Sequence, residues 1–440
     1  MRIRLLGVAV SATLAGTVAA QTTATENSPP LRFDAVTQTA GNAVQTVPLT
    51  LDEAQRIALD NNPLLLSARS EADATAGSYM QAGARPNPEV SFLQEGFKSA
   101  ERTSTGLLSQ RIELAGQRSY RLDAASYARQ GALASLDGRV AILHADVSTA
   151  FYGVLFAQKT VELARDSADI ATRSAQLVQR RATAGKVSPV EATRAQVAAT
   201  EAQIALTSAN AFVSATRVKL ASTMGIPDLT DRVVTGDAEA LQVPIGLSAL
   251  QQRIEDSPAA RRTFAEIGRS NAILSLERAR RTPDITVSAG MKRIVAGGIS
   301  SNQAVVGISI PLPIFDTNRG AVIEARHRAE KASSDRDGAL AQMRMDIAQA
   351  YASYDAASSE ARRLKSEVLP AARQALDATS RGFDLGKFGF IDVLDAQRTL
   401  FQTRSQYLKA LIAARQAYAD LERLVGNIEL ASSLPPSAQP

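Results

Sequence analysis

An apolar stripe with a seven-residue rhythm occurs twice in the sequence, and it constrains the fold more than any other feature. Each stripe places apolar residues at alternating steps of three and four positions. The first comprises Val147, Ala150, Val154, Ala157, Val161, Ala164, Ala168, Ala171, Ala175 and Val178, and the second comprises the residues 200 positions further on, from Ile347 to Ala378. A period of 3.5 residues is typical of long helices in left-handed coiled-coil packing. The sequence therefore predicts a mainly helical fold of closely packed helices.

The helix that carries the first stripe is predicted to be very long. From Arg118 to Arg181 the pattern continues, which at 1.5 Å per residue gives about 96 Å of helix. Because proline lacks an amide hydrogen, Pro370 is expected to kink the second copy. We expect each helix to touch neighbours on two sides, because a second stripe runs beside the first at Phe156, Leu163, Ile170 and Leu177.

Landmark residues outside the stripes indicate one unit that occurs twice. Four pairs lie 201 positions apart: Gly106 and Gly307, Arg118 and Arg319, Gly185 and Gly386, Gly225 and Gly426. A repeat of this length indicates an internal duplication rather than a short solenoid period. Each unit is predicted to contain a helix, a β-hairpin, a very long helix, a turn and another helix. The predicted repeats span residues 49–225 and 247–426, with a linker over 226–246 and a tail over 427–440.

Both repeats are expected to open with a capped helix that a proline interrupts. Thr50 and Glu53 have the spacing of a capping box, and Ser248 is expected to open its helix in the same way. Asn62-Pro63 and Ser257-Pro258 lie at corresponding interruptions.

Alternating residues predict two β-hairpins. In the second repeat Ile285, Val287, Ala289 and Met291 alternate with polar or small residues, and so do the apolar residues from Val306 to Ile314. A Gly-rich loop at 296–301 is expected to join these strands. The weaker first copy predicts strands over 90–97 and 105–114.

The N-terminus reads as a secretory signal peptide over residues 1–20. Arg2 and Arg4 precede an uncharged apolar segment, and Val18-Ala19-Ala20 suits cleavage before Gln21. Because residue 21 is not cysteine, no N-terminal lipid anchor is expected. Residues 21–48 are polar and predict a flexible segment. No later stretch reaches the roughly 18 consecutive apolar residues of a membrane helix, so any membrane crossing is expected to use strands.

The composition excludes several classes of function. The chain has no cysteine, and its formal charge of +5 falls to +3 without Arg2 and Arg4, which is too mild to indicate nucleic-acid binding. His144 and His327 each stand alone in helical sequence. We find no pairing of nucleophile and base, no phosphate loop and no metal-ligand cluster. The sequence therefore predicts no enzyme, no catalytic residues, no cofactor and no metal site.

The hairpins separate two possible architectures. An ordinary two-helix coiled coil would explain the stripes alone, as in a periplasmic adaptor or scaffold without a pore. Such a scaffold has no use for two hairpins with open edges, because an isolated hairpin is only marginally stable. A membrane accepts strands only in a closed barrel, which needs at least eight. Several chains are therefore expected to pool their hairpins, and their helices likewise into a tube.

From Leu49 to Gly426 the sequence resembles the TolC-type outer-membrane efflux channels. The most specific segments are LSQRIELAGQR at 108–118, GISIPLPIFDTNRG at 307–320 and LGKFGFIDVLDAQRTL at 385–400. Within the family they look most like the heavy-metal branch, the outer-membrane partners of cobalt, zinc and cadmium efflux pumps. The resemblance implies a homotrimer with a twelve-stranded β-barrel in the outer membrane and an α-helical barrel in the periplasm.

The resemblance also assigns roles to particular residues. Asp392 and Asp395, one helical turn apart, match the acidic entrance motif and would place six carboxylates around the narrow end of a trimer. The corresponding Glu191 and Arg194 cannot form a second acidic ring. Phe388 replaces a basic residue that helps to latch the entrance in some members. The adaptor-facing helix tips would comprise Gly185, Lys186, Gly386, Lys387 and Phe388, and the strand-to-helix junction Pro311 and Pro313.

The implied function is a passive exit duct in the outer membrane of a Gram-negative bacterium. Its partners would be a periplasmic adaptor and an inner-membrane pump of the resistance-nodulation-division type, with outer-membrane lipid around the barrel. Heavy-metal cations are the expected substrate. A duct for drugs, solvents or type I secretion substrates is the alternative in the same class, and the pore-less scaffold is the alternative in another.

Overall fold

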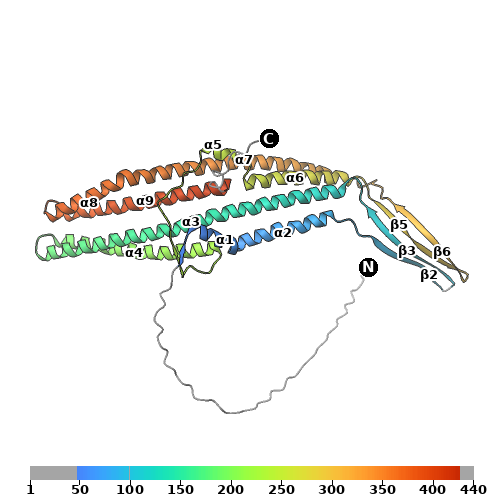
Figure 1. Ribbon diagram of the computed structural model, residues 1–440, viewed down its shortest axis with the longest axis horizontal. Coiled ribbons are helices and arrows are strands. Elements are labelled where there is room, and N and C mark those ends of the chain that lie inside the picture. Colours follow the sequence, from blue (N-terminus) through green and yellow to red (C-terminus); the bar gives the residue numbers. More distant parts are fainter. Residues whose placement is uncertain (1–46, 99, 427–440) are drawn as a thin grey trace, which may run out of the picture. The chain divides into compact units, whose positions relative to one another are not determined.

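The computed structural model describes residues 47–98 and 100–426 as long helices lying side by side, with a β-sheet beyond one end of them (Figure 1). The predicted signal peptide, most of the predicted flexible segment and the predicted tail lie outside the described residues. In chain order the elements are β1 (Val47–Leu49), α1 (Leu51–Asn61), α2 (Pro63–Gly83), β2 (Glu89–Lys98), β3 (Glu101–Ile112), α3 (Gln117–Thr183), α4 (Pro189–Met224), β4 (Arg232–Val234), α5 (Leu247–Gln252), α6 (Pro258–Ala279), β5 (Ile285–Ala296), β6 (Ile299–Ser309), α7 (Arg319–Arg363), the π-helical turn η1 (Leu364–Val368), α8 (Leu369–Asp384) and α9 (Phe390–Val425).

Helix α3 confirms the prediction of a very long helix. It has 67 residues, and its stripe is buried at eight of the ten predicted positions, with Val161 and Ala171 half-buried. Within the described residues, α3 is the one helix with an 18-residue window apolar enough to cross a membrane, and 56% of that window is buried. A helix buried against neighbours in this way fits the core of a helical bundle. Helices α2, α4, α6 and α9 pack along it.

The second stripe follows the prediction only as far as Leu364. From Ile347 to Leu364 its residues are buried, but Val368, Ala371, Ala375 and Ala378 are exposed. The π-helical turn η1 causes this difference, because Leu369 N–H donates to Leu364 O, one residue further back than in an α-helix. The extra residue rotates the rest of the helix, so Leu369 and Ala372 take the buried positions instead. The helix is therefore disturbed near Pro370 by a π-helical turn, and the register predicted beyond it was wrong.

The helix interruptions near residues 62 and 257 are confirmed. Asn62 ends α1 and caps α2, with its Oδ1 accepting from Leu64 N–H at 2.9 Å, and Ser257 Oγ caps α6. Thr50 Oγ1 accepts from Glu53 N–H, as its capping-box spacing predicted. Ser248 was wrongly assigned as a cap, because α5 already begins at Leu247 after Gly246.

The four long strands form one antiparallel sheet in the order β2-β3-β5-β6. The two predicted hairpins are thus joined by pairing of β3 with β5, in a register where Leu108 faces Ala289. The predicted strand bounds shift: β3 begins at Glu101 and ends at Ile112, and β6 ends at Ser309, before the predicted alternation does. The predicted loop at 296–301 is a two-residue turn, because Gly297 and Gly298 both adopt positive φ.

One face of this sheet is apolar. Register places Val90 beside Leu108, Ala289 and Val306 in one row, with a second apolar row at Val287 and Ile308. Val90, Val306 and Ile308 are 81%, 77% and 69% exposed. The sheet therefore presents a wide apolar surface that no other part of the described chain covers.

A short parallel pair joins the start of the described chain to the linker. Val47–Leu49 pairs with Arg232–Val234, so Val47 and Pro48 do not belong to a flexible segment as predicted. Leu49 is fully buried, and the linker contributes Leu229, Val234 and Ala238 to the same core. The linker is thus packed structure that lies against α1, α3 and α4.

Candidate functional site

The two helix tips at 185 and 386 share one backbone design. After α3, Lys186 N–H donates to Arg181 O at 2.9 Å and Gly185 N–H to Ala182 O at 2.9 Å. After α8, the amides of Lys387 and Gly386 make the equivalent bonds at 2.8 and 3.0 Å. Both glycines have positive φ, +69° and +72°. These are Schellman motifs, which explains why glycine stands at each tip. The lysines that follow, Lys186 and Lys387, are exposed.

Asp392 and Asp395 lie on the exposed side of the first turns of α9, but they are not equivalent. Asp392 Oδ2 accepts a hydrogen bond from Gly389 N–H at 2.9 Å, and so satisfies an amide at the helix start. Asp395 has no hydrogen-bond or ion-pair partner among the described residues. Asp395 is therefore the carboxylate of this pair that stays free of contacts within the described residues.

A small apolar cluster holds the two tips together. Phe383 of α8 and Phe390 of α9 lie 5.9 Å apart, between centroids, and pack with Ala175, Val178 and other residues of α3 and α4. Arg181 extends from α3 across this cluster: its Cζ lies 4.3 Å from the Phe383 ring centroid, and its Nη1 donates to Phe383 O at 3.2 Å. This link was not predicted from the sequence. The sequence feature that could have indicated it is an arginine near the end of α3 and a phenylalanine near the end of α8, the corresponding helix of the second repeat.

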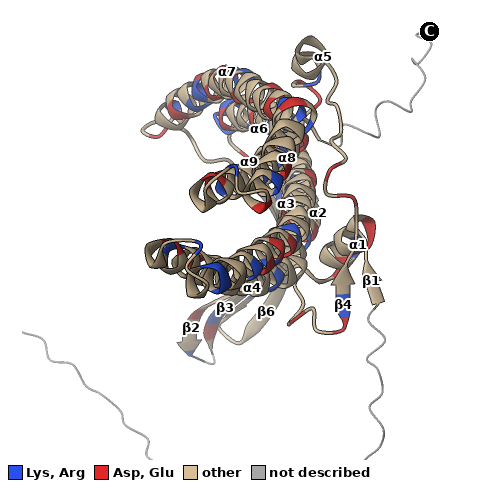
Figure 2. Cartoon of the chain, turned by 90° about the vertical axis from the view of Figure 1, so that its left-hand side faces the viewer, with Lys and Arg blue, Asp and Glu red and all other residues tan. Residues whose placement is uncertain are grey.

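Phe388, expected among the adaptor-facing residues, is 49% exposed and lies on Gly382. A Cβ at Gly382 would approach the Phe388 ring to 2.0 Å, so this glycine makes room for the ring. Phe388 therefore packs partly against its own tip. Figure 2, which views the chain from the tip end, shows basic and acidic residues interspersed on the helices there.

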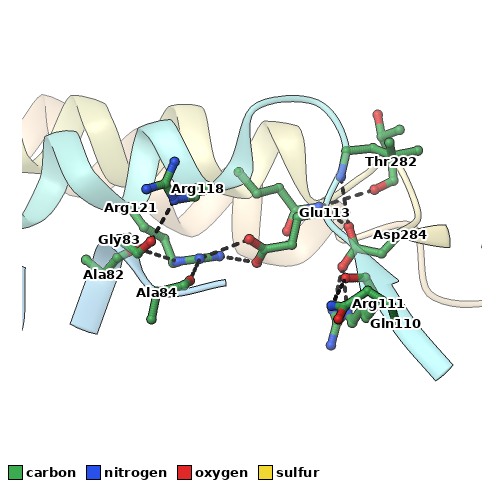
Figure 3. A network of polar contacts seen from close by, with 12 residues as sticks. Ala82, Gly83, Ala84, Gln110, Arg111, Glu113, Arg118, Arg121, Thr282 and Asp284 are labelled. Atoms are coloured by element: carbon green, nitrogen blue, oxygen red, sulfur yellow. Dashed lines mark hydrogen bonds and ion pairs between the residues drawn. The ribbon is translucent and has the colours of Figure 1, made fainter. Parts of the chain in front are cut away.

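Pro311 and Pro313 lie in the connection between Ser309, the end of β6, and Arg319, the start of α7. Both follow the last residue of the strand, where their missing amide hydrogens cost no ladder bond. In the connection between α6 and β5, Asp284 lies directly before β5 and is 7% exposed. Figure 3 shows how the side chains at this junction meet.

Asp284 joins three segments through one carboxylate. Arg111, at the end of β3, donates to Oδ2 from Nε at 2.8 Å, and its Nη2 forms an ion pair with the same oxygen at 2.6 Å. Oδ1 accepts from Gln117 Nε2 at 2.9 Å and from Leu114 N–H at 3.3 Å. Nearby, Arg121 of α3 binds Glu113 and donates to Ala84 O at 3.2 Å. Strand β3 ends at Ile112, and Glu113, Leu114 and Gln117, which follow it, take part in this network.

A second polar contact ties the linker to the π-helical turn. Glu239 accepts from Lys365 Nζ at 2.6 Å and from the Tyr407 hydroxyl at 3.0 Å. The hydrogen bond from Lys365 lowers the pKa of the Glu239 carboxyl. These residues line a cavity of about 510 Å³ together with Arg404 and Asp166. The charged side chains that line it are of both signs.

Within residues 47–98 and 100–426, no group of three or more His, Asp or Glu side chains could hold a metal ion. The features that stand out are an exposed acidic helix start, two tips closed by glycines with positive φ, and an exposed apolar sheet face.

Known proteins share this arrangement. A family model described as "Outer membrane efflux protein" matches residues 54–226 and 249–427. The cobalt-zinc-cadmium resistance protein CzcC of Cupriavidus metallidurans is 40% identical over 380 residues, 86% of this chain and 90% of that protein. Among solved structures, a membrane protein from Pseudomonas aeruginosa has a TM-score of 0.75 at 19% identity, over 90% of this chain and 96% of that one. The structure of CusC has a TM-score of 0.72 at 16% identity, over 89% and 95%. The chain therefore belongs to the outer membrane efflux protein family, a family of efflux channels in the outer membrane of Gram-negative bacteria.

Proposed function

We propose that this chain is the exit duct of a tripartite system that exports divalent heavy-metal cations. It would receive the ions from a periplasmic adaptor and an inner-membrane pump of the resistance-nodulation-division type, which supplies the energy. The observation that carries this proposal is the 40% identity to a cobalt-zinc-cadmium resistance protein, which extends over 86% of the chain. A duct for drugs or secreted polypeptides is the alternative that the experiment below must separate from it.

Assembly of three chains is part of this proposal, and the unpaired edges of the sheet support it. Strands β2 and β6 each leave one edge unpaired, and the strands have 10 to 12 residues, enough to span a bilayer as tilted strands. Four strands cannot close a barrel, whereas three sheets of four make twelve strands with no free edge. The apolar face at Val90, Val306 and Ile308 would then face lipid.

Asp392 and Asp395 are proposed to line the periplasmic entrance. In a trimer they would form a ring of carboxylates, which raises the local concentration of cations and their rate of entry. Asp395 supports this role best, because it is exposed and unpaired among the described residues. Asp392 would add charge while it caps α9.

The tips are proposed to meet the adaptor. Gly185, Lys186, Gly386 and Lys387 are exposed and sit in rigid Schellman turns, so an adaptor would meet a surface that is already ordered. Pro311 and Pro313 would mark the level at which the barrel strands give way to the helical tube.

A growth test decides the substrate. The gene is deleted, and the strain is exposed to zinc, cobalt, cadmium, nickel, copper and silver salts beside a panel of drugs and detergents. We expect sensitivity to one or a few metal ions, restored by the cloned gene. Unchanged metal tolerance together with new drug sensitivity would refute the heavy-metal assignment and favour the alternative duct.

A planar-bilayer measurement tests the entrance. We expect Asp395→Asn to reduce cation selectivity more than Asp137→Asn, the matched control. Asp137 is a half-exposed acid paired with Arg261 at 2.9 Å, away from the tips. Equal selectivity in the Asp395→Asn variant and the unmodified channel would remove Asp395 from the entrance.

A further inference from the structure

The two faces of the four-stranded sheet differ in charge. Successive residues of a strand point to opposite faces, so the register assigns each strand residue either to the apolar face of Val90, Leu108 and Val306 or to the opposite face. The three glutamates of these strands and three of their basic residues fall on the opposite face: Glu89, Glu95, Glu101, Lys98, Arg111 and Lys292. The two remaining basic residues, Arg102 and Arg293, lie on the apolar face. Among the strand residues described, the apolar face therefore carries two positive charges and no carboxylate.

These arginines lie where the apolar face becomes polar, toward the hairpin turns. Rows of paired residues cross the sheet, and the row that contains Met291 is still apolar. In the next row Arg293 pairs with Ser104 on one side and with Asn302 on the other, and Arg102 lies in the row beyond it. The two arginines therefore stand at the edge of the exposed apolar surface.

Arg102 and Arg293 are close neighbours. Arg102 pairs with Val295, two residues beyond Arg293 on the same strand, and diagonal neighbours of this kind lie about 7–8 Å apart. Both side chains are exposed, and neither has a hydrogen-bond or ion-pair partner in residues 47–98 and 100–426. Two unpaired guanidinium groups at this spacing suit an anionic group that lies between or above them.

The height of the arginines on the sheet matches a lipid headgroup region. The strands join the helices at the end of the sheet that holds Ile112, Ile285 and Ser309, and both hairpin turns lie at the other end. Arg293 lies eight residues from Ile285, which is about 26 Å along an extended strand. A barrel tilt of about 40° reduces this to about 20 Å, and the long side chain extends further toward water. With the helices in the periplasm and an apolar band about 25 Å tall, the guanidinium groups would reach the headgroups of the outer leaflet.

We propose that Arg102 and Arg293 bind the phosphate groups of lipid in the outer leaflet of the outer membrane. The planar guanidinium group donates two parallel hydrogen bonds to a phosphate, which suits arginine to this ligand better than lysine. Ser104 and Asn302, in the same row as Arg293, offer further donors to the headgroup. The acyl chains would lie along the apolar face, so one lipid would contact both parts of this surface. The inference rests on the proposed function, because the apolar face meets lipid only as part of a membrane barrel.

Thermal melting with added lipid tests the site. The detergent-solubilised protein is titrated with lipid A, a glycolipid that carries two phosphates on its headgroup, and the Tm is followed by circular dichroism. Binding to the folded protein raises the Tm, so the lipid concentration needed for a fixed rise reports the affinity. An arginine near an anionic headgroup strengthens binding about fivefold, so Arg102→Gln with Arg293→Gln should raise this concentration about 25-fold. Arg102→Lys with Arg293→Lys keeps the charge and loses the planar group, so its affinity should lie between those of the parent protein and the glutamine variant.

Lys292→Gln is the matched control. It removes the same charge one residue from Arg293, but on the opposite face of the sheet, so it should need the same concentration of lipid A as the parent protein. Equal weakening by Lys292→Gln and Arg293→Gln would show that net charge attracts the lipid, and would overturn the assignment to this face. Inorganic phosphate at the same concentrations should leave the Tm unchanged. A rise with inorganic phosphate as large as the rise with lipid A would show a site for a free anion only.

The remaining outcomes separate this inference from the proposed function. If the glutamine variant and the parent protein respond equally to lipid A, yet both run as trimers on native gels and restore metal tolerance, the lipid site is refuted and the channel stands. An equal response to lipid A and to its dephosphorylated form would likewise refute the site, because it would leave the phosphates without a role. If the parent protein is not a trimer and restores no tolerance, both proposals fail.

Discussion

Replacing Asp284 by alanine tests whether one carboxylate holds the sheet on the helices. Asp284 is 7% exposed, accepts three hydrogen bonds, from Arg111, Leu114 and Gln117, and forms an ion pair with Arg111. Asp284→Ala leaves the Gln117 amide, itself 6% exposed, with only its long hydrogen bond of 3.5 Å to Thr282 O, which costs about 1–3 kcal/mol. The lost backbone hydrogen bond at Leu114 adds about 1 kcal/mol. The Arg111 guanidinium is 62% exposed and regains water, so it adds little.

The expected loss is therefore about 3 kcal/mol, counting the amide and the backbone bond. With an unfolding entropy of about 2.1 cal/mol/K per residue over about 380 residues, this corresponds to a Tm lower by about 4 °C. The assay is loss of the helical circular-dichroism signal on heating the detergent-solubilised protein. Far less change is expected for Lys159→Met, because Lys159 pairs with Glu162 at a surface where such pairs contribute about 0.2–0.5 kcal/mol.

A Tm for Asp284→Ala that equals the Tm of Lys159→Met would refute this account of the junction. Arg111→Met gives an internal check. It removes the exposed partner and leaves Asp284 with its bonds from Leu114 and Gln117, so it should destabilise the protein less than Asp284→Ala does.

Three further predictions concern other parts of the chain. Gly225→Ala should lower the Tm more than Gly185→Ala. Both glycines have φ near +70°, where an alanine costs about 1–2 kcal/mol. A Cβ at Gly225 would also lie 2.4 Å from Asn61 O, whereas a Cβ at Gly185 would meet open space. Equal Tm values would show that the packing at Asn61 gives way. Arg181→Gln should increase hydrogen exchange at both tips and leave the β-sheet unchanged, and exchange identical to the parent protein would contradict its linking role. Burial lowers the pKa of His144, so the stability contributed by its neutral form is present above about pH 6.5 and is lost as the pH falls. His144→Gln should therefore make the Tm depend less on pH between about pH 7.5 and 5.5. An unchanged dependence of Tm on pH would argue against this role of His144.

Much of the fold was predictable because its signals are local. The long helix α3 follows from a period of 3.5, and the strands follow from a period of two. The tips could be placed at Gly185 and Gly386, because a Schellman turn needs a residue that tolerates positive φ. Asp392 and Asp395 could be placed at the start of α9 because the helical pattern restarts directly after Gly389.

The phase of α8 could not be predicted from the stripe alone. The apolar pattern continues from Leu364 to Ala378 without a break, whereas the helix takes up one extra residue in the π-helical turn before Pro370. A proline predicts a disturbance of the helix, but it does not say whether the helix bends or gains a residue.

By itself, then, the sequence determined the periodic elements, their duplication and their ends, because each of these depends on residues within a few positions of one another. Only the tertiary structure decided which elements meet. Pairing of β3 with β5, burial of Asp284 against Gln117, contact of Arg181 with Phe383 and docking of the linker on α1 join residues far apart in the chain. No local pattern encodes such partners, because they are selected by the packing of complete helices and strands against one another.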